Sequence, residues 1–136
     1  MRTASLSDIV SYVRVFKNKW FHRWAHGEKI PGALLLKAAM EIVEGKVEAD
    51  LGGSLFKKRL ARAGSGKRGG YRTIVGYKRP NSKRVIFLYA FAKSGKANIS
   101  AKEEAALSLV AEAFVSATDS QINRLLAEGS IWEVQQ

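Results

Sequence analysis

The fold is decided by residues 55–96, which read LFKKRLARAGSGKRGGYRTIVGYKRPNSKRVIFLYAFAKSGK. Three strand-like runs, Leu55–Ala63, Tyr71–Tyr77 and Arg84–Ala92, are separated by a Gly/Ser-rich segment and by Pro-Asn-Ser. Such runs, divided by turn residues, are typical of consecutive antiparallel strands. The third run is apolar on both faces, so we expect an interior strand with a neighbour on each side.

The same stretch carries charge of one sign. Residues 54–96 contain 13 Lys or Arg and no Asp or Glu, whereas residues 1–53 hold 8 bases and 6 acids and residues 97–136 hold 2 bases and 6 acids. The local charges are therefore +13, +2 and −4 in a chain of net charge +11. A basic sheet framed by near-neutral and acidic helices is suited to a polyanion, and the natural polyanion is nucleic acid.

Two helices are predicted before the sheet. A β-like run at residues 13–16 leads to Asn18, a plausible cap for a short helix. Trp20 and Trp24 stand one turn apart in that helix, and we interpret them as core packing. A second helix is expected from Gly32 to about Glu44, followed by a loop over residues 48–54.

Two more helices are predicted after the sheet. Capping boxes at Ser100–Glu103 and Thr118–Gln121 each precede an apolar helical pattern. Residues 131–134 suit either a terminal strand or a docked tail. The expected order is β-α-α-β-β-β-α-α, an α+β fold with a small, mainly antiparallel sheet and helices on one face.

Length and composition favour one ordinary domain. The 136 residues are 46% hydrophobic, which suits a single core over residues 13–136, and we interpret the weakly patterned residues 1–12 as a disordered or loosely docked extension. The absence of Cys excludes disulfides and thiolate chemistry. Neither a signal peptide nor an apolar run of ~18 residues is recognisable, so a cytoplasmic protein without membrane contact is expected.

Four motifs carry a resemblance to a known family. They are Ala49-Asp-Leu-Gly-Gly53, Leu55–Arg62, Gly69-Gly-Tyr-Arg-Thr-Ile74, and Phe91-Ala-Lys-Ser94 leading to Asn98-Ile99. In this order they resemble RelE-like toxins of type II toxin–antitoxin systems, over about residues 13–134. The resemblance implies a compact microbial ribonuclease-like fold, cleavage of mRNA in the ribosomal decoding site with inhibition of translation, and a cognate antitoxin partner.

RNA cleavage sets demands on the residues that could perform it. Attack of a ribose 2′-OH on the adjacent phosphate needs a proton acceptor, cations for the charged phosphorane, and a proton donor for the leaving 5′-oxygen. Between Ser54 and Lys96 the chain has neither His nor a carboxylate, so the candidates there are Lys, Tyr and Arg. Neighbouring cations lower the pKa of a lysine and so fit it for proton transfer, whereas arginine stays charged and serves as a clamp.

The resemblance also suggests the site residues. Arg72 follows the family's Gly-Tyr, and Lys93 ends the last strand, although Ser94 replaces the arginine that often follows there and no Tyr occurs after Tyr89. We expect Arg72 at a strand end with little buried contact. The candidate catalytic residues are Arg72, Lys93, Lys57 and Arg59. The candidate RNA contacts are Lys58, Arg62, Lys67, Arg68 and Lys96.

Other functions remain open at this point. ParE-type toxins share the architecture and poison DNA gyrase, and a noncatalytic RNA-binding module would also present a basic sheet. The glycine-rich residues 64–70 lack the Ser/Thr and the strand-to-helix context of a phosphate loop. His22 and His26 have only Glu28 nearby, too few ligands for zinc. We therefore expect no cofactor and no metal.

Overall fold

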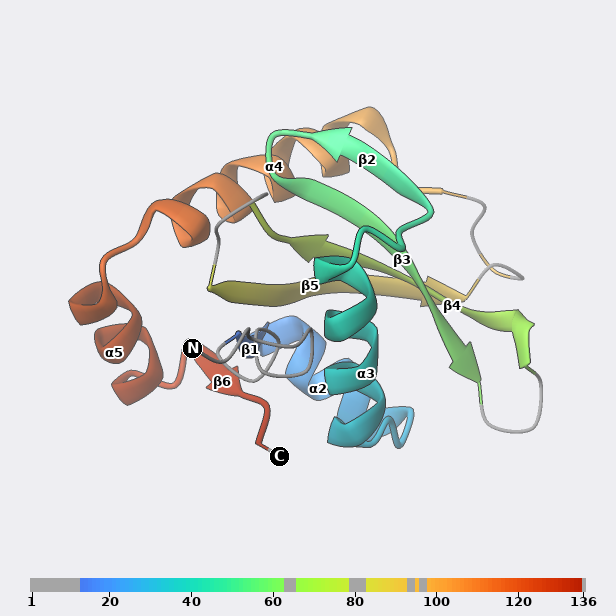
Figure 1. Cartoon of the computed structure of the whole chain (residues 1–136), viewed down its shortest axis with the longest axis horizontal. Coiled ribbons are helices and arrows are strands. Elements are labelled where there is room, and N and C mark those ends of the chain that lie inside the picture. The colour runs from blue at the N-terminus through green and yellow to red at the C-terminus, as the bar shows by residue number, and fades with distance from the viewer. Residues whose placement is uncertain (1–12, 63–65, 79–82, 93–94, 96–97, 136) are drawn as a thin grey trace, which may run out of the picture.

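A computed structural model describes residues 13–62, 66–78, 83–92, 95 and 98–135 (Figure 1). The predicted extension, residues 1–12, lies outside the described part. In chain order the elements are β1 (Arg14–Asn18), α2 (Lys19–Gly27), α3 (Gly32–Val43), β2 (Ala49–Gly52), β3 (Leu55–Arg62), β4 (Gly66–Gly76), β5 (Arg84–Ala92), α4 (Ala101–Ser116), α5 (Asp119–Ala127) and β6 (Ile131–Glu133).

The described strands form one sheet in the order β2-β3-β4-β5-β1-β6. All neighbouring strands are antiparallel except the pair β1 and β5, which are parallel. The α+β class, the mainly antiparallel sheet, the element order and the interior position of β5 are therefore confirmed. Two short strands add to the predicted order: β6 at the C-terminus, and β2 in the segment expected to be a loop.

β2 forms because its turn is well defined. The Asp50 carboxylate accepts a hydrogen bond from the Gly52 N–H at 2.9 Å. Gly52 and Gly53 have φ of 79° and 56°, a left-handed conformation that glycine adopts without steric cost. The chain can therefore reverse directly into β3, and β2 pairs with its first three residues.

Helices cover both faces of the sheet, so the prediction of helices on one face is wrong. On one face Phe21 of α2 and Leu35 of α3 pack in a core with Phe87 of β5. On the other face Phe114 of α4 packs in a second core with Ile86. Figure 1 shows α4 and α5 as an arc at the top and left, away from α2 and α3. The apolar run in β5 is the reason, since both of its faces must be covered.

The predicted helix starts are confirmed. The Asn18 side chain accepts from the Phe21 N–H at 2.8 Å, and its amide also donates to the Leu88 carbonyl at 3.0 Å. Both capping boxes are formed, at the starts of α4 and α5. Because Asn18 bonds to both α2 and β5, it fixes the start of α2 beside the middle of β5.

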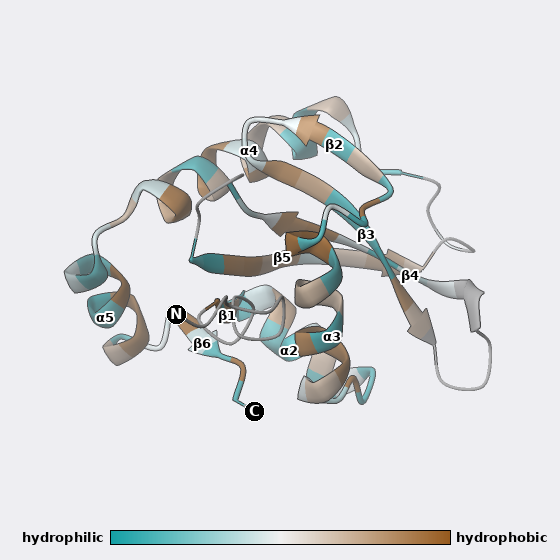
Figure 2. Cartoon of the chain, in the orientation of Figure 1, coloured by the Kyte–Doolittle hydropathy of each residue, from teal (hydrophilic) through white to brown (hydrophobic). Residues whose placement is uncertain are grey.

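The sheet changes character along its length. Figure 2 shows β5 mostly hydrophobic, whereas β3 passes from hydrophobic to hydrophilic residues. α4 approaches β4 at Gly76, where an added Cβ would lie 3.2 Å from the Ala111 side chain. Arg72 precedes Gly76 by four residues in β4, which places the two residues about 13 Å apart along the strand. The charged end of the sheet therefore lies beyond the crossing point of α4. No described helix is long and apolar enough to cross a membrane.

Candidate active site

Two arginines on neighbouring strands share one carboxylate. Arg59 of β3 and Arg72 of β4 are directly opposite in the strand register. The Arg72 Nε lies 3.2 Å from Glu48 Oε2, and the Arg59 Nε is paired with Glu48 Oε1. The Glu48 N–H donates to the Lys57 carbonyl at 2.8 Å, which anchors Glu48 beside β3. The backbone register thus holds a carboxylate between two guanidinium groups.

Arg72 is buried, which corrects the expectation of a strand-end residue with little buried contact. It lies within β4, and its side chain is only 6% exposed, against 45% for Arg59. Its Nη1 is buried and has no hydrogen-bond partner among the described residues. A buried donor without an acceptor lowers the stability of the fold, so it needs an explanation. The planar guanidinium group can bind a phosphate through two parallel hydrogen bonds.

Sequence reasoning missed Glu48. The search for a proton acceptor covered residues 54–96, and Glu48 lies six positions earlier, in a segment expected to be a loop. Antiparallel pairing of β2 with β3 carries it back to Arg59. A sequence signal does exist, because Gly52-Gly53 marks a tight reversal that folds the preceding residues onto the basic strand.

Lys57 lies on the same face as Arg59, since alternate residues of a strand point the same way. Its Nζ is 3.3 Å from the Asn98 Oδ1, a neutral partner. Lys57 is opposite Ile74 in the register, and Ile74 is opposite Tyr89 of β5. This part of the face, on β3 and β4, thus brings together the side chains of Lys57, Arg59 and Arg72 with the carboxylate of Glu48. We call this set the basic face.

Lys58 points the other way, which corrects the expectation that it contacts RNA. Its side chain is 7% exposed, forms an ion pair with Glu41 of α3 at 3.1 Å and donates to the Lys46 carbonyl at 2.9 Å. Both partners belong to the side of the sheet covered by α3. Lys58 therefore joins β3 to α3.

The structure leaves the other candidates untested. Of Arg62, Lys67 and Arg68 it places only the backbones, in β3 and β4. Lys93 and Lys96 lie outside the described residues. These five residues remain predictions as RNA contacts or, for Lys93, as a catalytic group.

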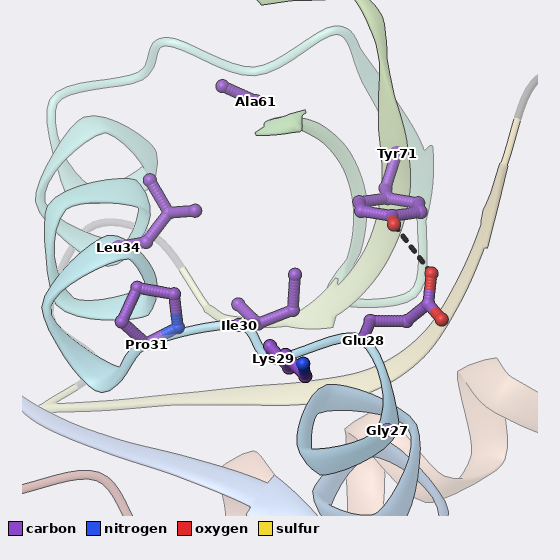
Figure 3. Close-up of a pocket in the computed structure, with 8 residues that line it drawn as sticks. All are labelled: Gly27, Glu28, Lys29, Ile30, Pro31, Leu34, Ala61 and Tyr71. Carbon is purple, nitrogen blue, oxygen red and sulfur yellow. Dashed lines mark hydrogen bonds between the residues drawn. The ribbon is translucent and has the colours of Figure 1, made fainter. Parts of the chain in front are cut away.

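A separate cavity of about 470 Å³ lies where the α2–α3 connection meets β3 and β4 (Figure 3). In it the Tyr71 hydroxyl donates to the Glu28 carboxylate at 2.5 Å. Tyr71 is adjacent to Arg72 in β4 and belongs to the core on the α3 side. The cavity is thus on the opposite face from Arg72. The remaining lining residues are Gly27, Lys29, Ile30, Pro31, Leu34 and Ala61.

A metal site is not formed by the described part of the chain. Within it, no group of three or more His, Cys, Asp or Glu side chains is placed to hold an ion. Glu48 is paired with guanidinium groups rather than with further acids.

The described residues thus form an α+β fold in which one carboxylate lies between two arginines on a face of the sheet. The family model described as the RelE toxin of the RelE/RelB toxin–antitoxin system matches residues 13–134. The chain belongs to that family of toxins, and family membership implies a cognate antitoxin. No curated protein matches the sequence.

Proposed function

We propose that this toxin is a metal-independent endoribonuclease that cleaves mRNA on the ribosome and so inhibits translation. The observation that carries the proposal is Glu48, held between Arg59 and Arg72. A carboxylate repels the phosphate backbone and so does not itself attract RNA to a noncatalytic surface. A nuclease can use a carboxylate as a proton acceptor.

The reaction can be written through the described side chains. An RNA phosphate displaces Glu48 from the Arg72 fork and accepts a hydrogen bond from the buried Nη1, which has no partner among the described residues. Glu48 then accepts the proton of the 2′-hydroxyl as the 2′-oxygen bonds to phosphorus. Arg59 and Arg72 stabilise the charged phosphorane. The bond from phosphorus to the 5′-oxygen breaks as that oxygen takes a proton, for which Lys57 is the described candidate and Lys93 the other.

The partners follow from the same charges. A basic face that cleaves the cell's own mRNA must be masked, and an acidic antitoxin segment laid over it would compete with RNA for Arg59 and Arg72. The mRNA and the ribosome are the polyanions that it would meet once the antitoxin is removed.

Glu48→Gln tests the proposal directly. Glutamine keeps the shape and a hydrogen bond to Arg72 but cannot accept the proton, so cleavage should fall by roughly 10²- to 10⁴-fold. Cuts in cellular mRNA would be mapped by primer extension after induction at equal protein levels. Undiminished cutting by Glu48→Gln would remove Glu48 from the mechanism.

The same experiment separates the other functions. Cuts phased with codons are expected for the wild type. A DNA damage response without mRNA cuts would indicate a gyrase poison. The absence of both mRNA cuts and a DNA damage response would indicate a passive RNA-binding module.

A further inference from the structure

Helix α2 presents cations and indoles on its outer surface. Its sequence, KWFHRWAHG, contains no acid. Lys19, Trp20, Arg23 and Trp24 line one surface depression. Positions four apart in a helix are neighbours, so the two cations stand one turn apart and so do the two indoles. The near-neutral balance of residues 1–53 conceals this local basic surface.

Trp20 is not a core residue, which corrects the interpretation of this indole as core packing. It is 43% exposed, one of the few large apolar side chains of the described chain that remain open. Its ring is nonetheless held, 4.5 Å from the Tyr89 ring and stacked at 6.3 Å on Trp24. Trp24 in turn packs edge-on to Tyr71 at 4.9 Å. An exposed indole fixed by its neighbours is preorganised for a flat ligand.

The indole adjoins the basic face. Tyr89 lies 6.2 Å from Phe91, measured between ring centroids, and Phe91 is opposite Arg72 in the register. Tyr89 is also two strands from Lys57, a separation of about 10 Å. A single-stranded chain on the basic face would therefore reach Trp20 when it leaves the sheet across β5.

We propose that Trp20 and Tyr89 form a stacking site for an RNA base, with Lys19 and Arg23 holding the adjoining phosphate. The proposal rests on the proposed function, because it extends the path of the same RNA strand from the basic face. Aromatic side chains that alternate with cations bind single strands by stacking the bases and neutralising the backbone. The site would be tolerant of sequence, since every base has a flat face.

The exposed indole next to these cations favours RNA over an acidic peptide. A peptide would satisfy Lys19 and Arg23 equally well, but it would use the exposed indole of Trp20 only through an occasional aromatic side chain. A nucleic acid supplies a flat ring next to every negative charge. The alternative of an antitoxin contact is therefore an outcome of the test.

The test measures affinity for two short oligomers of equal length and charge. Both are 2′-O-methyl RNA, which cannot be cleaved because the attacking hydroxyl is blocked. One carries bases and the other is abasic. Trp20→Ala should weaken binding of the base-bearing oligomer about 10-fold and leave the abasic one unchanged. Trp20→Phe should retain most of the affinity, because it keeps a ring.

A Lys19→Ala, Arg23→Ala double variant should behave differently. It should weaken both oligomers equally and flatten the dependence of log affinity on log salt by about 0.7, the change expected for the loss of one phosphate contact. Leu109→Ala, at an exposed apolar residue on α4, is the matched control and should change neither affinity.

Four results would overturn the proposal. They are no binding of the base-bearing oligomer by the wild type, equal loss for both oligomers in Trp20→Ala, loss of thermal stability by Trp20→Phe, and loss of antitoxin binding with RNA binding intact. The last would assign the surface to the antitoxin. Since nothing is cleaved, failure here is distinct from failure of the Glu48 test.

Discussion

The two faces of β3 hold neighbouring cations in opposite states. Lys58 faces α3, with an ion pair to Glu41 and a hydrogen bond to the Lys46 carbonyl. Arg59 faces the other way and shares the single carboxylate of Glu48 with Arg72, whose buried Nη1 has no hydrogen-bond partner in the described part of the chain. Lys58 and Arg72 are about equally buried, at 5% exposure each, so burial alone does not distinguish them.

The difference lies in how completely each charge is satisfied. A buried cation with a carboxylate and a carbonyl within reach contributes to folding. A buried cation that has an N–H group without an acceptor can still bind an incoming anion. This comparison leads to three predictions.

The largest effect is expected on the basic face. Arg72→Ala should reduce cleavage by roughly 10²-fold or more, because it removes a preorganised charge from the phosphorane. Arg72→Lys should restore only part of the rate, since an ammonium group cannot reproduce the bidentate fork. The measurement is primer extension on cellular mRNA at equal expression.

Because Arg72 is buried, Arg72→Ala should also lower the free energy of unfolding. Glu48 keeps Arg59, so the free energy of unfolding should fall by only about 1–2 kcal/mol, rather than by the larger cost of isolating a buried charge. Lys102→Ala, which also removes a positive charge but from an exposed position in α4, is the control and should leave cleavage and stability unchanged. Full toxicity of a folded Arg72→Ala variant would make this arginine incidental.

An intermediate effect is expected on the other face. Lys58→Met keeps the aliphatic stem but removes the hydrogen bond to the Lys46 carbonyl and the ion pair with Glu41, so the free energy of unfolding should fall by about 1–3 kcal/mol. Thermal denaturation would show this as a lower midpoint. Cleavage per folded molecule should stay within about twofold. A larger loss of cleavage with normal stability would show that the two faces are not separate in role.

The smallest effect is expected at the far edge of the sheet. Arg14 of β1 donates two hydrogen bonds, of 2.8 and 2.9 Å, to the Glu133 carboxylate of β6. These bonds hold the pKa of Glu133 below its usual value, although partial burial acts in the opposite direction. Because Arg14 is 38% exposed, solvent screening limits the pair to about 0.5 kcal/mol.

The sign of the pH dependence follows from that lowered pKa. The contribution of Glu133 to stability is complete above the unfolded-state pKa of roughly 4.3 and is lost as the pH falls through the lower folded-state value. The stability difference between the wild type and Glu133→Gln should therefore be constant near neutral pH and shrink in acid. A difference that grows on acidification would contradict the assignment. Urea denaturation at several pH values would measure it.

Much of the fold could be predicted from local patterns. Asn18, Ser100 and Thr118 were recognisable as caps because a cap needs only residues three positions away. The prediction of helices on one face failed because the helices that bury β5 come from separate parts of the sequence. The apolar run of β5 indicated burial on both faces, but its sequence does not say which helices supply the cover.

The site was predictable in part. Arg59 and Arg72 were suggested by a motif resemblance and then brought opposite each other by strand pairing. Lys58 was assigned to the wrong role because a cation on a strand looks the same whether a helix covers it or not. Trp20 was interpreted as a core residue because aromatic residues at helical spacing are usually buried. The local pattern does not show that α2 begins beside β5, directly after β1 ends at Asn18, which leaves Trp20 partly exposed.

The sequence by itself determined the α+β class, the helix boundaries and a strongly basic central sheet, because these depend on residue type and on neighbours a few positions apart. Only the tertiary structure decided that Glu48 lies between Arg59 and Arg72, that Lys58 is packed against α3, and that Trp20 adjoins Tyr89. Each of these is a contact between separate elements. Its existence depends on strand register and helix placement, which local sequence does not encode.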